Sequence, residues 1–150
     1  MANTYTALHF HIVFSTKNRE PWFSASKETR IWEYLGGIAR ANGMKALQVG
    51  GYDDHIHILL ALPTTMSVSK AVQLLKGASS RWIHETDNDM SAFAWQDGYG
   101  AFTVGVSQVA DTKRYIEGQR EHHRTKSFQE EYVHFLNKHD LAYDERYVWG

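Results

Sequence analysis

The segment Asp53–Leu60 most constrains the fold of this chain, because it has the composition of a buried strand between turn signals. It reads Asp-Asp-His-Ile-His-Ile-Leu-Leu, it follows Gly50-Gly51, which predicts a turn, and a proline ends it soon afterwards. Successive side chains of a strand point to opposite faces. His55 and His57 are therefore expected on one face, with two isoleucines on the other.

Two imidazoles on one face of a stiff strand suit a divalent cation that needs two preset ligands. The same spacing also occurs where both histidines are simply hydrogen-bonded within a core. A second element favours the metal site: Tyr115 and Gln119 lie further along the chain at helical spacing. The sequence therefore leaves two interpretations, a metal site and a pair of hydrogen-bonded core histidines.

The composition narrows the class of protein. The length of 150 residues suits one domain spanning 1–150, and the absence of cysteine excludes disulfides, thiolate zinc sites and cysteine nucleophiles. No apolar run is long enough for a membrane helix, and no signal pattern opens the chain, so we expect a cytoplasmic protein without a membrane partner. With a net charge of −1, nucleic-acid binding must rest on local patches.

The order of periodic segments predicts an α+β fold with a ferredoxin-like split βαβ antiparallel sheet. Its first and third strands would be central neighbours, with helices on the face opposite the histidines. The sequence predicts β-α-β-β-α-β and then two helices: a strand at Tyr5–Ser15, a helix closed by Asn42-Gly43, strands at Met44–Val49 and Asp53–Leu60, a helix capped by Ser67, a strand at Phe102–Val106, a tyrosine-bearing helix from Ser107 to about His123, and a C-terminal helix opened by a Ser127–Glu130 capping box.

Two segments could contact nucleic acid. The helix after Ser67 places Lys70, Lys76 and Arg81 opposite its packing side, among small residues. An ordinary solvated helix face explains that pattern equally well. The loop after the first strand adds Lys17 and Arg19, and on its own evidence a solvated turn explains these two cations better than a phosphate clamp.

Tyr115, Gln119 and His122 lie at i, i+4 and i+7 and so share one face of the predicted helix. That face is too polar for an ordinary core, and it offers a nucleophile and an oxygen ligand. Together with His55 and His57 it permits covalent phosphoryl transfer: the histidines and the Gln119 amide hold a metal, which polarises a phosphate that the Tyr115 oxygen attacks.

These residues resemble a known family. Asp54-His55-Ile56-His57 resembles the HUH motif, and Tyr115–Gln119 resembles the tyrosine helix of single-tyrosine transposases of the insertion sequence 200/605 type. The segments Phe14–Arg19, Leu75–Arg81 and Gly98–Phe102 fit the same pattern. The segment from His122 to Glu131 is most similar to the branch of transposases associated with repetitive extragenic palindromes.

The resemblance implies a transposase that cleaves and rejoins single-stranded DNA and recognises hairpins at element ends. Tyr115 would form a 5′-phosphotyrosine, the metal ligands would be His55, His57 and Gln119, and Asp54 and His122 would support them. It further implies a homodimer with an active site shared between subunits, although the sequence alone leaves open whether the tyrosine helix serves its own chain or its neighbour.

The resemblance implies Mg²⁺ or Mn²⁺, whereas paired imidazoles alone favour zinc or manganese. We follow the family, because an amide oxygen and open positions for water make the ligand set more favourable to Mg²⁺ or Mn²⁺ than two imidazoles alone. Three other functions stay open: a non-catalytic ferredoxin-like module that binds single-stranded nucleic acid, another metal-dependent phosphoesterase or nickase, and a domesticated relative of the transposases that processes palindromic repeats.

Overall fold

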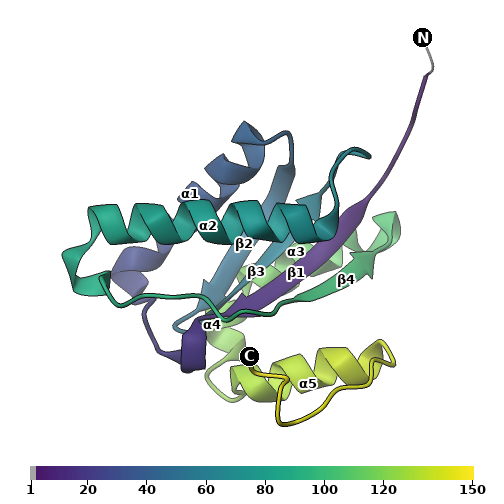
Figure 1. The fold of residues 1–150 in the computed structure, drawn as a ribbon. Helices are drawn as coiled ribbons and strands as arrows, with labels where there is room; N and C mark the ends of the chain where they lie inside the picture. The colour runs from purple at the N-terminus through teal and green to yellow at the C-terminus, as the bar shows by residue number, and fades with distance from the viewer. Residues whose placement is uncertain (1–2) are drawn as a thin grey trace.

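The computed structural model describes residues 3–150 and is built on an antiparallel sheet with strand order β2-β3-β1-β4 (Figure 1). The strands are β1 (His9–Ser15), β2 (Lys45–Tyr52), β3 (His55–Ala61) and β4 (Gly100–Val104). The α-helices are α1 (Ala25–Ala41), α2 (Val68–Thr86), α3 (Val109–Glu117), α4 (Gln119–His122) and α5 (Phe128–Lys138). Short 3-10 turns occupy η1 (Lys17–Arg19), η2 (Asn88–Met90) and η3 (Val106–Gln108).

The predicted fold is confirmed. The chain runs β-α-β-β-α-β through β4, and β1 and β3 are the central neighbours of the sheet. Their antiparallel register sets Val13 opposite His57 and Ser15 opposite His55. The histidine strand therefore lies in the middle of the sheet, where two neighbouring strands hold its backbone rigid.

The two faces of the sheet carry different chemistry. One face is apolar and packs against α1 and α2, through Ile12, Phe14, Ile56, Ile58 and Leu60. The other carries the histidines, and its apolar part, Val13 and Phe102, packs against α5. In Figure 1, α2 and α5 lie on opposite sides of the sheet. None of the helices within residues 3–150 is long and apolar enough to cross a membrane.

Two predicted helix starts are confirmed by their hydrogen bonds. The Ser67 hydroxyl accepts from the backbone N–H of Lys70, which satisfies one free donor of the first turn of α2. At α5 the Ser127 and Glu130 side chains each accept from the other's backbone, so the capping box is complete. These local signals are strong because they depend only on residues within one turn.

The predicted turn at Gly50-Gly51 is wrong, because both glycines lie inside β2 and the turn falls at Asp53 and Asp54. Gly50 serves a different purpose. A Cβ atom there would lie 2.5 Å from the backbone oxygen of Ile116 in α3, well inside van der Waals contact. The missing side chain lets α3 lie directly on the sheet.

The tyrosine-bearing segment also differs from the prediction. The helix does not begin at Ser107, which lies in η3, and it breaks at Gly118 into α3 and α4. Glycine lowers helical stability by about 1 kcal/mol relative to alanine, which makes this position the weak point of the segment. Strand limits move as well. β1 begins at His9 instead of Tyr5, β2 ends at Tyr52 instead of Val49, and β4 spans Gly100–Val104 instead of Phe102–Val106, while the other limits move by one or two residues.

Candidate active site

The site begins with His55, whose contact with Asp54 fixes the position of one ring proton. Its Nδ1 lies 2.8 Å from Oδ1 of Asp54. Because a carboxylate only accepts, Nδ1 carries the proton and donates it, which leaves the lone pair on Nε2. Asp54 thus lies directly beside His55, and its role in supporting a metal ligand stays a prediction. The His55 side chain is fully buried.

Gln119 of α4 meets His55 across the site. Its Oε1 lies 3.0 Å from Nε2 of His55 and 2.9 Å from Nε2 of His123, and its Nε2 donates to Glu131 at 3.1 Å. The bond to Glu131 sets the orientation of the amide, so its oxygen points at the His55 lone pair. Two acceptors 3.0 Å apart need a cation or a further proton between them.

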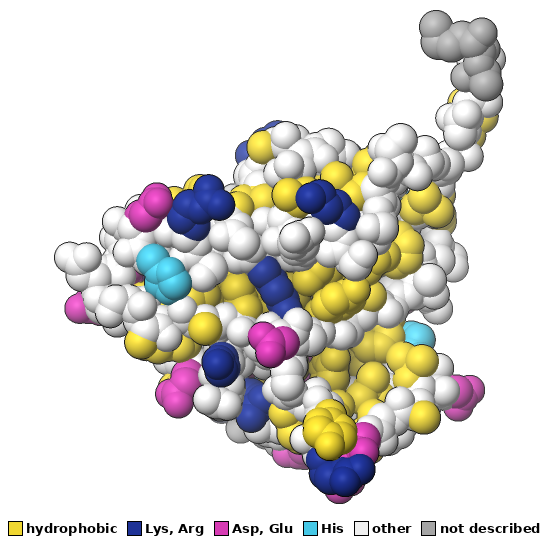
Figure 2. All heavy atoms as spheres, in the orientation of Figure 1, with side chains coloured by type: hydrophobic (Ala, Val, Ile, Leu, Met, Phe, Trp, Pro, Cys, Tyr) yellow, Lys and Arg dark blue, Asp and Glu magenta, His cyan; other side chains and the backbone are white. Residues whose placement is uncertain are grey.

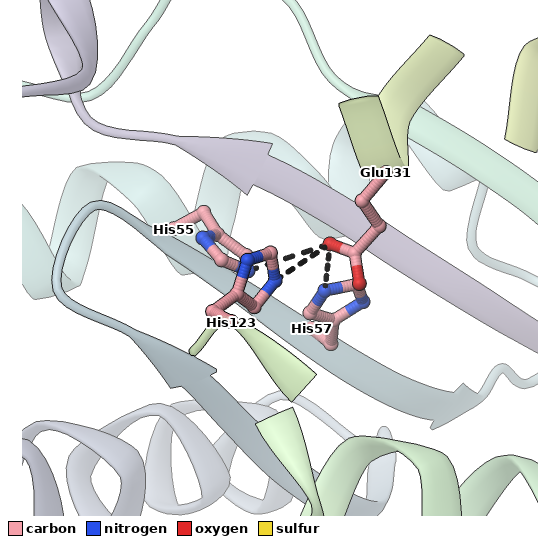
Figure 3. A group of neighbouring side chains, drawn as sticks. All are labelled: His55, His57, His123 and Glu131. Carbon is pink, nitrogen blue, oxygen red and sulfur yellow. Dashed lines mark hydrogen bonds and ion pairs between the residues drawn. The ribbon is translucent and has the colours of Figure 1, made fainter. Parts of the chain in front are cut away.

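Glu131 of α5 is the centre of the cluster, and the sequence interpretation missed it (Figure 3). Its Oε1 lies 2.9 Å from Nε2 of His57 and 3.3 Å from Nε2 of His123. Its Oε2 accepts from the Gln119 amide and from the Tyr115 hydroxyl. The side chain is only 1% exposed. Burial alone would raise the pKa of this carboxyl, but the neighbouring His57 and His123 hold it well below its usual range.

His123 was also missed, although it lies one turn after Gln119. Its Nδ1 donates to the carbonyl of Lys126, and its Nε2 faces the oxygens of Gln119 and Glu131. Burial lowers the pKa of His123, yet the hydrogen bond and charge of Glu131 outweigh it and raise the pKa above its usual value. An imidazole with acceptors at both nitrogens is held as the cation.

His11 of β1 completes the buried group behind His57. Its Nε2 lies 2.7 Å from Nδ1 of His57. Since Nε2 of His57 donates to Glu131, Nδ1 of His57 accepts from His11. Burial, followed by the nearby His57, lowers the pKa of His11 well below 6.5, so His11 is neutral at pH 7.

Tyr115 lies where this buried group meets the surface. Its hydroxyl donates to Oε2 of Glu131 and lies 3.4 Å from Nε2 of His122. Burial and the negative charge of Glu131 both raise the pKa of Tyr115, so the phenol is neutral at pH 7. The fold therefore brings Tyr115, Gln119 and His122 to the histidine pair. All these residues belong to one chain.

The donor set suits a divalent cation. His55, His57, His123 and Glu131 each offer one ligand atom, and these atoms lie within 4.8 Å of one another. Gln119 adds an amide oxygen directed at His55. Imidazole nitrogens combined with carboxylate and amide oxygens suit manganese or zinc and accommodate magnesium less readily. For His57 to bind through Nε2, its proton must move to Nδ1, and His11 must change to the tautomer whose Nε2 accepts there. His123 must likewise give up its Nε2 proton before that nitrogen can bind the cation.

The predicted nucleic-acid contacts lie outside this cluster. Lys17, Lys70 and Arg81 are exposed, and Arg19 donates to the carbonyl of Trp149 at 2.9 Å. Figure 2 shows Lys and Arg side chains scattered over the α2 face among apolar and neutral groups. Their contact with nucleic acid stays a prediction.

Lys76 differs from the other cations on α2. Its Nζ donates to the carbonyls of Gln96, Asp97 and Gly98, at 2.7, 3.1 and 2.7 Å, and lies 5.0 Å from the centre of the Phe14 ring. Burial lowers the pKa of Lys76 to about 8, which leaves it protonated at pH 7. The ammonium group holds the loop before β4 in place through these three hydrogen bonds. A phosphate would have to compete with the three carbonyls for the ammonium group.

Replacing Lys76 with Gln is expected to lower the free energy of unfolding by roughly 1–3 kcal/mol, because three carbonyls lose a charged donor. Urea denaturation measures this, and Lys70→Gln on the exposed part of the same helix is the control, with a change below about 0.5 kcal/mol. Unchanged unfolding together with weaker, more salt-dependent DNA binding would instead support a phosphate contact by Lys76.

Comparison with known proteins identifies the protein family of this chain. A family model described as "Transposase IS200 like" matches residues 4–119. The transposases for insertion sequence element IS200 of Salmonella typhimurium and Salmonella typhi are each 32% identical over 126 residues, which cover 81% of this chain and 82% of theirs.

Solved structures agree in fold. A candidate transposase of Deinococcus radiodurans R1 has a TM-score of 0.65 and 24% identity, over 79% of this chain and 96% of that one. A tyrosine transposase described as REP-associated and bound to a REP hairpin has a TM-score of 0.59 and 13% identity, over 82% and 73%. The fold is thus one that DNA transposases use. The chain belongs to the IS200-like transposase family, as its motifs predict, and as a transposase it is a DNA-cleaving enzyme.

Proposed function

We propose that this chain is a metal-dependent transposase in which Tyr115 attacks a phosphate of single-stranded DNA. The observation that carries the proposal is the shared carboxylate: Glu131 accepts from the Tyr115 hydroxyl and from Nε2 of His57. A nucleophile and a ligand candidate are therefore joined through one buried group. Membership of the IS200-like family supplies the class of reaction.

His55, His57 and Gln119 would hold the divalent cation, with Glu131 and His123 close enough to join them. When bound, such a cation supplies polarisation of a phosphate oxygen and charge stabilisation of the transition state. Magnesium and manganese are the cations proposed from the family resemblance, and the donor set favours manganese of these two.

The chain's own residues perform the covalent step. The Tyr115 oxygen forms a bond to phosphorus, the bond from phosphorus to the 3′-oxygen breaks, and the product is a 5′-phosphotyrosine with a free 3′-hydroxyl. The phenolic proton leaves along its hydrogen bond to Oε2 of Glu131 and passes on to solvent, because the lowered pKa of this carboxyl does not let it keep the proton. The leaving 3′-oxygen takes its proton from solvent.

Hairpin DNA is the proposed substrate. The support is the solved REP-associated tyrosine transposase, which is bound to a REP hairpin and shares this fold. Lys17, Arg19, Lys70 and Arg81 are proposed to contact its backbone. We also propose that residues 1–150 form one domain and that the protein is cytoplasmic.

The homodimer also stays part of the proposal, but its shared active site is not needed for a complete catalytic group. Tyr115, Gln119 and the histidine pair are joined by hydrogen bonds within one chain. Sharing would require α3 to leave the sheet at Gly50, where no room exists for a side chain between them. We infer that the tyrosine serves its own chain.

The test is a covalent adduct. The protein is incubated with single-stranded DNA carrying a hairpin and its flanks, with manganese or with EDTA, and separated under denaturing conditions. A nuclease-sensitive protein–DNA species is expected only with manganese. Hairpin binding without any adduct, across a set of flanking sequences, would favour the non-catalytic binding module.

A further inference from the structure

A cavity of about 370 Å³ opens beside Tyr115, between α3 and α5. Its lining includes the buried His11 of β1 and Phe135 of α5, which form the floor, and the more exposed Lys126, His134 and Lys138, which form the rim. Its volume is that of a small-molecule site and accommodates a single nucleotide.

The cavity adjoins the buried cluster without being part of it. His55, His57, Gln119 and Glu131 do not line it, and each is at most 1% exposed. Tyr115 and His122 line the cavity and also contact Glu131. A group that occupies the cavity therefore lies against the side of Tyr115 that solvent can reach.

The charge of the lining favours an anion. Within residues 3–150, neither Lys126 nor Lys138 forms an ion pair. The one acidic lining group, Asp111, is paired with Arg114. Two unpaired ammonium groups at the rim of a cavity with a neutralised carboxylate attract phosphate.

The rings of the lining favour a base. Phe135 of the floor lies edge-on to Tyr115, with ring centres 5.9 Å apart, and His134 is its neighbour on α5. Bases stack on aromatic side chains in proteins that bind single strands, and stacking tolerates many sequences. A buried aromatic ring below a cationic rim matches the two parts of a nucleotide.

We propose that this cavity binds the nucleotide next to the scissile phosphate, its base against Phe135 and its phosphate toward Lys126 and Lys138. The inference rests on the proposed function, since it concerns the strand that Tyr115 attacks. It adds a site formed by α3, α5 and the segment before α5, outside the metal ligands and outside the cations predicted on α2.

The experiment measures binding in EDTA, so that no chemistry is required. Thymidine 5′-monophosphate and inorganic phosphate are titrated separately into the protein while the histidine ring signals are followed by NMR. The nucleotide is expected to shift the signals of His122 and His134 at a concentration at least tenfold lower than phosphate does. The Lys126→Gln/Lys138→Gln protein should lose at least tenfold in nucleotide affinity, while Lys45→Gln, an exposed lysine on β2, should match the unaltered protein.

Equal affinity for phosphate and nucleotide would reduce the cavity to a general anion site and overturn the proposal. Nucleotide binding that the double substitution leaves unchanged would overturn it too. These results are separable from failure of the proposed function. Binding at the cavity without any covalent adduct contradicts only the tyrosine chemistry, whereas adduct formation that is indifferent to both lysines contradicts only the cavity.

Discussion

Replacing Tyr115 with Phe is expected to abolish the covalent adduct and to lower DNA cleavage by a factor on the order of 10⁴, because it removes the attacking oxygen. The folded chain should persist. Glu131 loses one donor but keeps the Gln119 amide and His57, so the free energy of unfolding should change by about 1 kcal/mol. Denaturing gels measure the adduct, and urea unfolding measures stability.

Tyr99→Phe is the matched control, since this tyrosine is 36% exposed and lies on the loop before β4. It should form the adduct at the normal rate. An adduct that persists in the Tyr115→Phe protein at the normal rate would mean that another residue is the nucleophile.

The same variant tests whether subunits share a site. It is mixed with a His55→Ala/His57→Ala protein under conditions where exchange of subunits is demonstrated by differently labelled chains. A site complete within one chain predicts that the mixture stays inactive. Recovered cleavage would show that the tyrosine helix serves its neighbour, as the family resemblance implies, and would contradict our inference.

The second large effect is expected at Glu131. Replacing Glu131 with Ala leaves the Tyr115 hydroxyl, the Gln119 amide and two imidazoles without their common acceptor. Removing one partner of a buried charged network costs roughly 3–5 kcal/mol, so the metal-free protein should be strongly destabilised. Glu131→Gln keeps the shape and one acceptor oxygen, and it should retain part of that stability.

This effect has a defined pH dependence. The pKa of Glu131 is lowered in the folded protein from the ordinary value of 4.5. The unfolded chain therefore takes up the proton first as the pH falls, and the stabilisation by Glu131 is fully present above about pH 4.5 and lost below it. The difference in unfolding free energy between the unaltered and Glu131→Gln proteins, measured in EDTA, should shrink below that pH. A difference that stays constant from pH 7 to pH 3 would show that the carboxylate charge does not contribute.

Much of the fold follows from local pattern. The alternation of β1, the Ser67 cap and the Ser127–Glu130 box depend on residues close in sequence, and each could be predicted. The sheet order follows from the sequence of elements, because few topologies are compatible with it. The opposite placement of His55 and the isoleucines needs only the period of a strand.

The cluster at Glu131 could not be predicted in the same way, since it joins β3, α4 and α5 across long stretches of chain. One signal was present. Phe128, Glu131, Tyr132 and Phe135 fall at i, i+3, i+4 and i+7, so an acidic residue lies within the apolar stripe of α5. A charge at such a position calls for a buried partner. The pattern identifies Glu131 as an unusual buried charge but does not show which groups form its hydrogen bonds.

The contact at Gly50 has a consequence for how accurately the nucleophile is held. The backbone of Ile116, the residue after Tyr115, lies directly on β2, so the position of the phenol is set by main chain against main chain. Such a contact has few soft torsions and varies little with thermal motion. Rate falls steeply when a reacting group is displaced by about 1 Å. The glycine at position 50 therefore sets the distance between α3 and the sheet. Any side chain there would tilt the helix and shift the tyrosine, although it would touch neither DNA nor metal.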